Sequence, residues 1–110
     1  MKEDFPIFVR WSDATDWILD TVEKFPKSVR FTISGRIGNM TLDVMEGIIE
    51  AIYTKDRSHI LERLNLRIEK LRVMFRISYR RKYISRSQYE HVSEILDETG
   101  KMLGGWRKRQ

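Results

Sequence analysis

The 110-residue sequence contains no cysteine, only two prolines and only two histidines. The lack of cysteine excludes a disulfide framework and any metal site built from thiolates. Because Pro6 and Pro26 both lie in the first quarter of the chain, proline does not prevent residues 27–110 from being helical. No apolar run approaches the length of a membrane span, and no N-terminal stretch has the pattern of a signal peptide. A single cytoplasmic domain with no membrane association is therefore expected.

Positive charge is concentrated in one part of the chain, residues 57–86. This segment holds ten lysines and arginines against two acids, a net charge of +8, whereas the whole chain carries +5. Residues 1–56 are acidic, with seven bases against ten acids, and residues 87–110 are balanced at four against four. A segment of this kind attracts phosphate backbones whatever their base sequence.

Apolar residues recur at helical spacing in four segments separated by short turns. This pattern predicts an all-α fold, an antiparallel up-and-down four-helix bundle. The expected helices cover about residues 12–24, 27–54, 58–81 and 85–105.

The expected organisation has three parts. Residues 1–11 form an extended N-terminal arm, residues 12–106 form the bundle domain, and residues 107–110 form a basic C-terminal tail. Ser12 or Asp13 is the expected cap at the start of the first helix.

The expected fourth helix has clear signals at both of its ends. Ser85 and Gln88 have the spacing of a capping box, in which each side chain bonds the backbone of the other. Gly104 and Gly105 are expected to end the helix. Trp106 would then fold the chain end back onto the bundle as an apolar anchor.

The second and third helices each carry two apolar stripes, although a monomeric bundle needs only one stripe per helix. The core stripe of the third helix runs from Leu61 to Ser78 with the spacing of a bundle seam. The additional stripes consist of Phe31, Leu42, Met45, Ile49, Leu66, Val73 and Ile77. We expect these seven residues to be buried between the subunits of a homo-oligomer. In the alternative, a monomer, they lie under the N-terminal arm or remain partly exposed.

The sequence offers no catalytic residues, no metal ligands and no cofactor site. No histidine follows a glutamate at the three-residue spacing of a di-iron bundle site, and His59 and His91 lie on different helices. The segment 35–38 has two glycines but lacks the lysine of a phosphate-binding loop. Asp43, Glu46 and Glu50 form an acidic edge that is expected to pair with arginines rather than to act in acid–base chemistry. The expected protein is not an enzyme.

The basic residues of the third helix are the candidate binding site. They flank the additional apolar stripe on its two sides, and the set is Arg63, Arg67, Lys70, Arg72, Arg76, Arg80 and Arg81. We expect them to bind RNA or DNA through its phosphates, because nothing in the sequence indicates base readout. In one alternative, the charges are only solvated or paired with acids. In another, they dock an acidic protein partner and the chain acts as an interaction scaffold.

Five segments resemble the Avd family, the accessory variability proteins of diversity-generating retroelements. They are residues 23–32 (EKFPKSVRFT), 42–53, 65–72 (NLRIEKLR), 88–91 (QYEH) and 100–106 (GKMLGGW). The resemblance covers nearly the whole chain in the same order. Avd proteins are four-helix bundles related to those encoded by intervening sequences in bacterial 23S rRNA genes, and the latter branch is a second possible assignment.

The resemblance implies a pentameric barrel of bundles with a basic surface. It also implies a non-catalytic protein that binds nucleic acid and the retroelement's reverse transcriptase, which together make the error-prone cDNA that diversifies a target gene. Arg67, Lys70, Arg72 and Arg76 fall in the family's basic third-helix region, so the resemblance assigns them to nucleic-acid binding.

Three glycines, Gly35, Gly38 and Gly47, depart from the family pattern, in which larger residues are expected at such helical positions. Each costs about 1 kcal/mol relative to alanine within a helix. We therefore expect either a close approach between two helices or a bend in the second helix at these positions.

Overall fold

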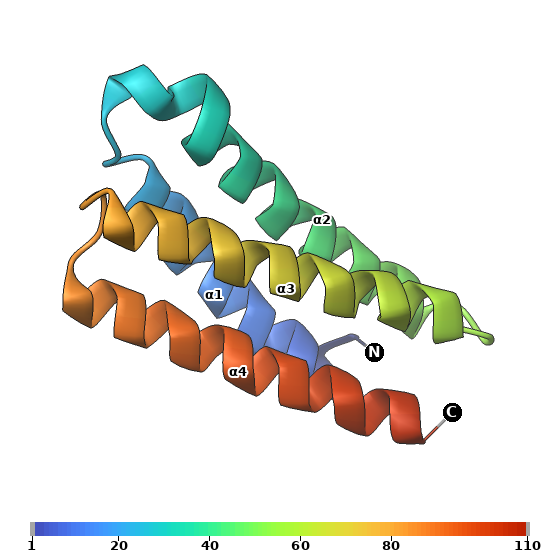
Figure 1. The fold of residues 1–110 in the computed structure, drawn as a ribbon. Helices are drawn as coiled ribbons and strands as arrows, with labels where there is room; N and C mark the ends of the chain where they lie inside the picture. The colour runs from blue at the N-terminus through green and yellow to red at the C-terminus, as the bar shows by residue number, and fades with distance from the viewer. Residues whose placement is uncertain (1, 110) are drawn as a thin grey trace.

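The computed structural model describes residues 2–109 and consists of four antiparallel α-helices joined by short turns (Figure 1). The helices are α1 (Pro6–Val22), α2 (Gly35–Ile52), α3 (Ser58–Arg80) and α4 (Arg86–Lys108). No strand occurs within residues 2–109, so the predicted all-α four-helix bundle is confirmed. None of the helices in this range is long and apolar enough to cross a bilayer.

The helices follow one another around the bundle, which measures 42 × 23 × 22 Å. α1 packs against α2 and α4, and α3 packs against the same two helices. α1 and α3 therefore occupy diagonal corners. Figure 1 shows that both chain ends lie at the end of the bundle opposite the α3–α4 turn.

The predicted core stripe of α3 lies at the centre of the bundle. Its buried members are Leu61, Leu64, Ile68, Leu71, Phe75 and Ser78. The Ser78 hydroxyl donates a hydrogen bond to the Met74 carbonyl at 2.8 Å, so this polar side chain is satisfied inside the core. The seam spacing of the sequence is thus sufficient to identify the inner face of α3.

The predicted N-terminal arm is wrong for residues 6–11, which form the first two turns of α1. Pro6 suits the first helical position because its fixed φ matches the helix and its missing N–H would have no partner there. These turns are needed in the core, where Trp11 is fully buried and its Nε1 donates to the Thr41 carbonyl at 3.1 Å. Ser12 is not a cap, since its hydroxyl donates to the Phe8 carbonyl at 2.9 Å from within the helix.

The predicted second helix is too long at its N-terminal end. A 3-10 helix, Lys27–Val29, and a π-helix, Arg30–Ser34, occupy the segment before α2. The wide π turn brings the Arg30 carbonyl oxygen to 3.1 Å from the place where a Cβ of Gly35 would stand. At Gly35 the structure shows this local irregularity in place of the expected bend in the second helix.

The predicted helix stop at Gly104 and Gly105 is also wrong, since α4 continues to Lys108. Residues 107 and 108 are thus part of a helix rather than of a separate tail, and residue 110 lies outside the described residues. Trp106 is buried, as an anchor should be, but from within the helix, with its ring 5.4 Å from the Phe5 ring between centroids. The contact between Trp106 and Phe5 stabilises the last turns of α4, which two glycines alone would leave prone to unwinding.

At the other end of α4, the predicted capping box at Ser85 and Gln88 is confirmed in both of its hydrogen bonds.

Gly47 lies at a close approach of α2 to α3. A Cβ at this position would stand 2.5 Å from Cδ2 and 3.2 Å from Cγ of Leu64, a residue that is only 1% exposed. The other expected explanation, close helix packing, therefore applies at Gly47. By contrast, a Cβ at Gly104 would meet nothing within 4 Å.

These two glycines give a stability prediction with a built-in control. Gly47→Ala is expected to destabilise the fold, because overpacking costs about 1–3 kcal/mol and helix propensity returns only about 1 kcal/mol. Gly104→Ala gains the higher helix propensity of alanine, and its Cβ meets no neighbouring atom. It is therefore expected to raise the free energy of unfolding by roughly 0.5–1 kcal/mol. Urea denaturation followed by circular dichroism measures both variants. Equal effects of the two substitutions would contradict the close packing at Gly47.

Candidate nucleic-acid interface

The seven basic residues predicted to bind nucleic acid all lie on α3 or on its C-cap. Six belong to the helix, and Arg81 follows its last residue. The structure divides them by their partners into three groups. Arg63, Arg67 and Arg72 pair with carboxylates, Arg81 pairs with a tyrosine hydroxyl, and Lys70, Arg76 and Arg80 form no ion pair within residues 2–109.

The first group includes two weak ion pairs between α3 and α2. Arg63 Nη2 lies 3.4 Å from Glu50 Oε2, and Arg67 Nε lies 3.9 Å from Asp43 Oδ2. All four side chains are at least about a third exposed, and exposed pairs of this kind contribute about 0.2–1 kcal/mol. The expected pairing of this acidic edge with arginines is confirmed for Asp43 and Glu50, whereas Glu46 forms no ion pair within residues 2–109. A phosphate can replace either carboxylate at small cost.

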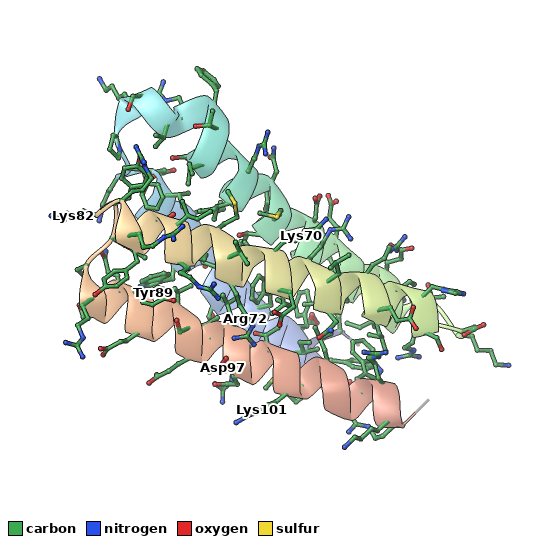
Figure 2. The ribbon with its side chains drawn as sticks, in the orientation of Figure 1. Lys70, Arg72, Lys82, Tyr89, Asp97 and Lys101 are labelled. Carbon is green, nitrogen blue, oxygen red and sulfur yellow. The ribbon has the colours of Figure 1, made fainter. Side chains whose placement is uncertain are left out.

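Arg72 is held much more firmly than its neighbours. Its guanidinium bonds Glu69 at 3.1 Å, the Leu96 carbonyl at 3.3 Å and the Asp97 carboxylate, and so fastens α3 to α4 (Figure 2). Partial burial by itself lowers the pKa of Arg72, but the hydrogen bond and charge of Asp97 and the charge of Glu69 outweigh it and raise the pKa above its ordinary value. With its donors occupied, Arg72 is less available to phosphates than the resemblance implied.

This arrangement predicts a stability role for Arg72. Arg72→Met keeps the apolar stem and removes the interhelical bonds, and it is expected to lower the free energy of unfolding by about 1–2 kcal/mol. Arg76→Met is the matched control. Arg76 lies one turn further along α3, is exposed and forms no ion pair within residues 2–109. This substitution should change the free energy of unfolding by less than about 0.5 kcal/mol. Chemical denaturation of the two variants tests this difference. An unchanged midpoint for Arg72→Met would show that the bonds to α4 are not stabilising.

The third group, Lys70, Arg76 and Arg80, is the most available to phosphates. All three residues are exposed, and they cover the solvent side of α3 on both sides of Val73. Beyond them, Arg81 Nε donates to the Tyr83 hydroxyl at 2.9 Å, and this hydrogen bond raises the pKa of Arg81. The candidate interface therefore consists of three available cations and further arginines held by weak surface bonds.

The residues predicted to form an oligomer interface remain uncovered in a single copy. Phe31, Leu42, Leu66 and Val73 are exposed, Phe31 by 90%, and Met45, Ile49 and Ile77 are half-buried. The N-terminal residues do not cover this stripe, because its members Leu42, Leu66 and Val73 stay exposed and α1 lies diagonally opposite α3.

A groove of about 620 Å³ lies between α2 and α3 at the level of Val73. It is lined by Arg36, Asn39, Met40, Glu69, Lys70, Val73 and Met74. Its lining combines the apolar side chains of Met40, Val73 and Met74 with three charged ones, a mixture that suits contact with another protein chain.

Two tyrosines missed as candidates lie beside the basic residues. Tyr79 of α3 and Tyr89 of α4 stack with their ring centroids 4.7 Å apart and their planes 2° from parallel. The signal that could have singled out Tyr79 is an aromatic residue between Arg76 and Arg80, since aromatic residues among basic ones are typical of single-strand binding surfaces.

The described residues show no cluster that suggests metal chemistry. Across residues 2–109, no group of three or more histidines, aspartates or glutamates is placed to hold a metal ion. The candidate site thus consists of cations, aromatic rings and an apolar groove.

Comparison with known families decides the assignment. The profile of the family described as bAvd-like matches residues 7–110 of this sequence. The chain belongs to the bAvd-like family. The resemblance noted from the five sequence segments is thereby confirmed, and it suggests an accessory, non-catalytic protein of a diversity-generating retroelement. No curated protein matches the sequence.

Proposed function

We propose that this bAvd-like protein is a non-catalytic, nucleic-acid-binding subunit that associates with the reverse transcriptase of its retroelement and supports mutagenic cDNA synthesis in the cytoplasm. Membership of the bAvd-like family supports the connection to a retroelement. The basic face of α3 supports the binding of RNA or DNA through phosphates.

The observation that carries the proposal is the set of three available cations on α3, Lys70, Arg76 and Arg80. Between them they span about three turns of one helix, so a flexible phosphate chain can reach all three. The diagonal corner of the bundle has the opposite charge, because α1 exposes Asp13, Asp16 and Asp20. Phosphates are attracted to one side of the molecule and repelled from the other.

The uncovered apolar stripe of α2 and α3 supports a homo-oligomer, and the family suggests a pentamer. An exposed Phe31 and Leu66 in a stripe of this length are unfavourable in water unless another surface covers them. In a closed ring, the basic edge of each copy is repeated around the assembly, and the fields of these edges add. The ring would therefore bind a long polyanion more tightly than a single copy does.

The proposal is tested by co-expressing the protein with its reverse transcriptase and purifying the complex with and without nuclease. Binding of single-stranded RNA and DNA is then measured as the salt concentration rises. A complex held by phosphates weakens steeply with salt because counterions return to the polymer. Absence of nucleic acid from the purified protein, together with no retention of either oligonucleotide at low salt, would refute the proposal.

A second candidate function is a protein-docking scaffold, which the groove between α2 and α3 favours. In that case the transcriptase remains bound after nuclease treatment, and nucleic acid contributes nothing to the complex.

Neighbouring genes separate the retroelement assignment from the intervening-sequence branch. A reverse transcriptase gene and a variable repeat beside this gene support the first assignment, and a ribosomal RNA operon supports the second.

A further inference from the structure

We propose that Tyr79 and Tyr89 form a platform on which a base of single-stranded nucleic acid stacks, so that the ligand of this protein is a single strand rather than a duplex. This inference rests on the proposed nucleic-acid binding and specifies the class of nucleic acid. It assigns to the two tyrosines the stacking of a base, which the positive charges of α3 cannot provide.

The platform is already assembled in the structure. The two rings come from different helices and lie parallel at 4.7 Å between centroids, with only 2° between their planes. Tyr79 is 36% exposed. A ring has two faces, so the pair can extend its stack by one further planar group from solvent. Because both rings are held by helices, little side-chain freedom is lost when a base stacks.

A sharp turn between the helices sets this geometry. Lys82 adopts a left-handed conformation with φ of 66°, and the Tyr83 N–H donates to the Ser78 carbonyl at 2.9 Å, which ends α3 abruptly. The Ser85 cap then starts α4 three residues after Lys82. The chain therefore reverses within a few residues and places Tyr89 against Tyr79.

The charges around the platform suit a phosphate chain. Residues 70–89 contain seven lysines and arginines and no acid. Arg76 stands three residues before Tyr79, and Arg86 stands three residues before Tyr89, a spacing that puts each cation on the same helix face as its tyrosine. Figure 2 places Lys82 and Tyr89 together at this end of the bundle, away from Lys101. Arg86 bonds Glu90 at 2.9 Å, but its side chain is 83% exposed, so the bond is a weak surface one.

Other tyrosines of the chain lack this combination. Tyr83 packs against Phe25 at 5.4 Å between centroids and accepts the hydrogen bond of Arg81, so it is occupied by the fold. Tyr53 is 67% exposed but lies just after α2, at the opposite end of the bundle. Tyr53 is therefore a suitable control residue.

The platform selects single strands because of how bases are arranged in each form. In a duplex, every base is already stacked between its neighbours and its faces are inaccessible. In a single strand, a base can leave its neighbours and stack on an aromatic side chain, whatever its identity. The same cations serve both forms, so the preference for a single strand depends on the rings.

The test compares two oligonucleotides of equal length and phosphate number, a single-stranded DNA of twelve mixed bases and its fully abasic counterpart. Fluorescence anisotropy at fixed salt measures the affinity of each. The parent protein is expected to bind the base-containing strand about tenfold more tightly, the difference that one stacked base provides. Tyr79→Ala should remove this difference while leaving the affinity for the abasic strand unchanged. Tyr79→Phe, which keeps the ring, and Tyr53→Ala should both retain it.

Each other outcome overturns the inference in an identifiable way. Equal binding of both strands by the parent, or an unchanged preference in Tyr79→Ala, means that the tyrosines only pack α3 on α4 and that phosphate binding stands alone. Loss of both affinities in Tyr79→Ala, with reduced helical circular dichroism, assigns the residue to folding and also counts against the platform. Failure of the parent to bind either strand refutes the nucleic-acid function itself.

Discussion

The triple variant Lys70→Glu, Arg76→Glu and Arg80→Glu is expected to bind RNA and DNA roughly a hundredfold more weakly than the parent at physiological salt. The three residues are exposed and have no ion pair within residues 2–109, so reversing them removes phosphate contacts without leaving a buried carboxylate unpaired. Each lost contact also removes one released counterion. The slope of log affinity against log salt should therefore become shallower by about 2 to 3.

The matched control reverses three cations at the other end of the bundle. Lys55→Glu, Lys108→Glu and Arg109→Glu change the net charge equally, and all three residues are exposed. If only total charge attracts the polymer, the two triple variants lose affinity to the same degree, and the α3 surface has no special role. The surface assignment is supported when the α3 variant alone loses binding and its thermal unfolding matches that of the parent.

The second large effect is expected at the apolar stripe. The double variant Leu66→Asp and Val73→Asp should convert the proposed homo-oligomer to a monomer of 13.2 kDa at micromolar concentration. Both residues are exposed in a single copy, by 55% and 47%, so the substitutions leave the isolated bundle folded. Within an interface, by contrast, each carboxylate would be removed from water without a partner, at a cost of several kcal/mol.

Sedimentation velocity measures this change directly. Tyr53→Asp is the control, because Tyr53 is 67% exposed and lies outside the predicted stripe. The oligomer hypothesis fails if the parent itself sediments as a stable monomer at high concentration. If the parent is an oligomer that both variants leave intact, the subunits associate through another face.

The sequence predicts α3 almost completely, and the reason is its single, regular core stripe. Its expected limits were residues 58–81, and the helix spans Ser58–Arg80. The segment from Leu61 to Phe75 alternates spacings of three and four, which only a helix face can bury continuously. The concentration of cations on the same helix was equally visible, because charge needs no structure to be counted.

The chain termini of the fold were harder to predict because their signals are ambiguous. Pro6 can begin a helix or interrupt one, and only the burial of Trp11 against α2 shows which applies. Gly104 and Gly105 commonly end helices, yet the contact between Trp106 and Phe5 keeps α4 helical past them. Both errors arose where tertiary contacts override a local preference.

The partners of the site residues could not be predicted either. Arg72 and Asp97 are 25 residues apart, and their pairing depends on how α3 and α4 are rotated about their own axes. The same is true of Tyr79 and Tyr89, whose parallel rings require the left-handed turn at Lys82. Residue types on a helix face follow from spacing, but contacts between faces follow only from the packed structure.

The contact between Phe5 and Trp106 has a practical consequence for handling this protein. Any sequence joined ahead of Phe5 emerges beside any sequence joined after Trp106, about the length of the bundle away from the α3–α4 turn. An affinity tag, a dye or a surface tether at either terminus therefore leaves the opposite pole unobstructed. A short peptide bridging the termini would allow new ends to be opened at the loop between α2 and α3, yielding a circular permutant of the same architecture.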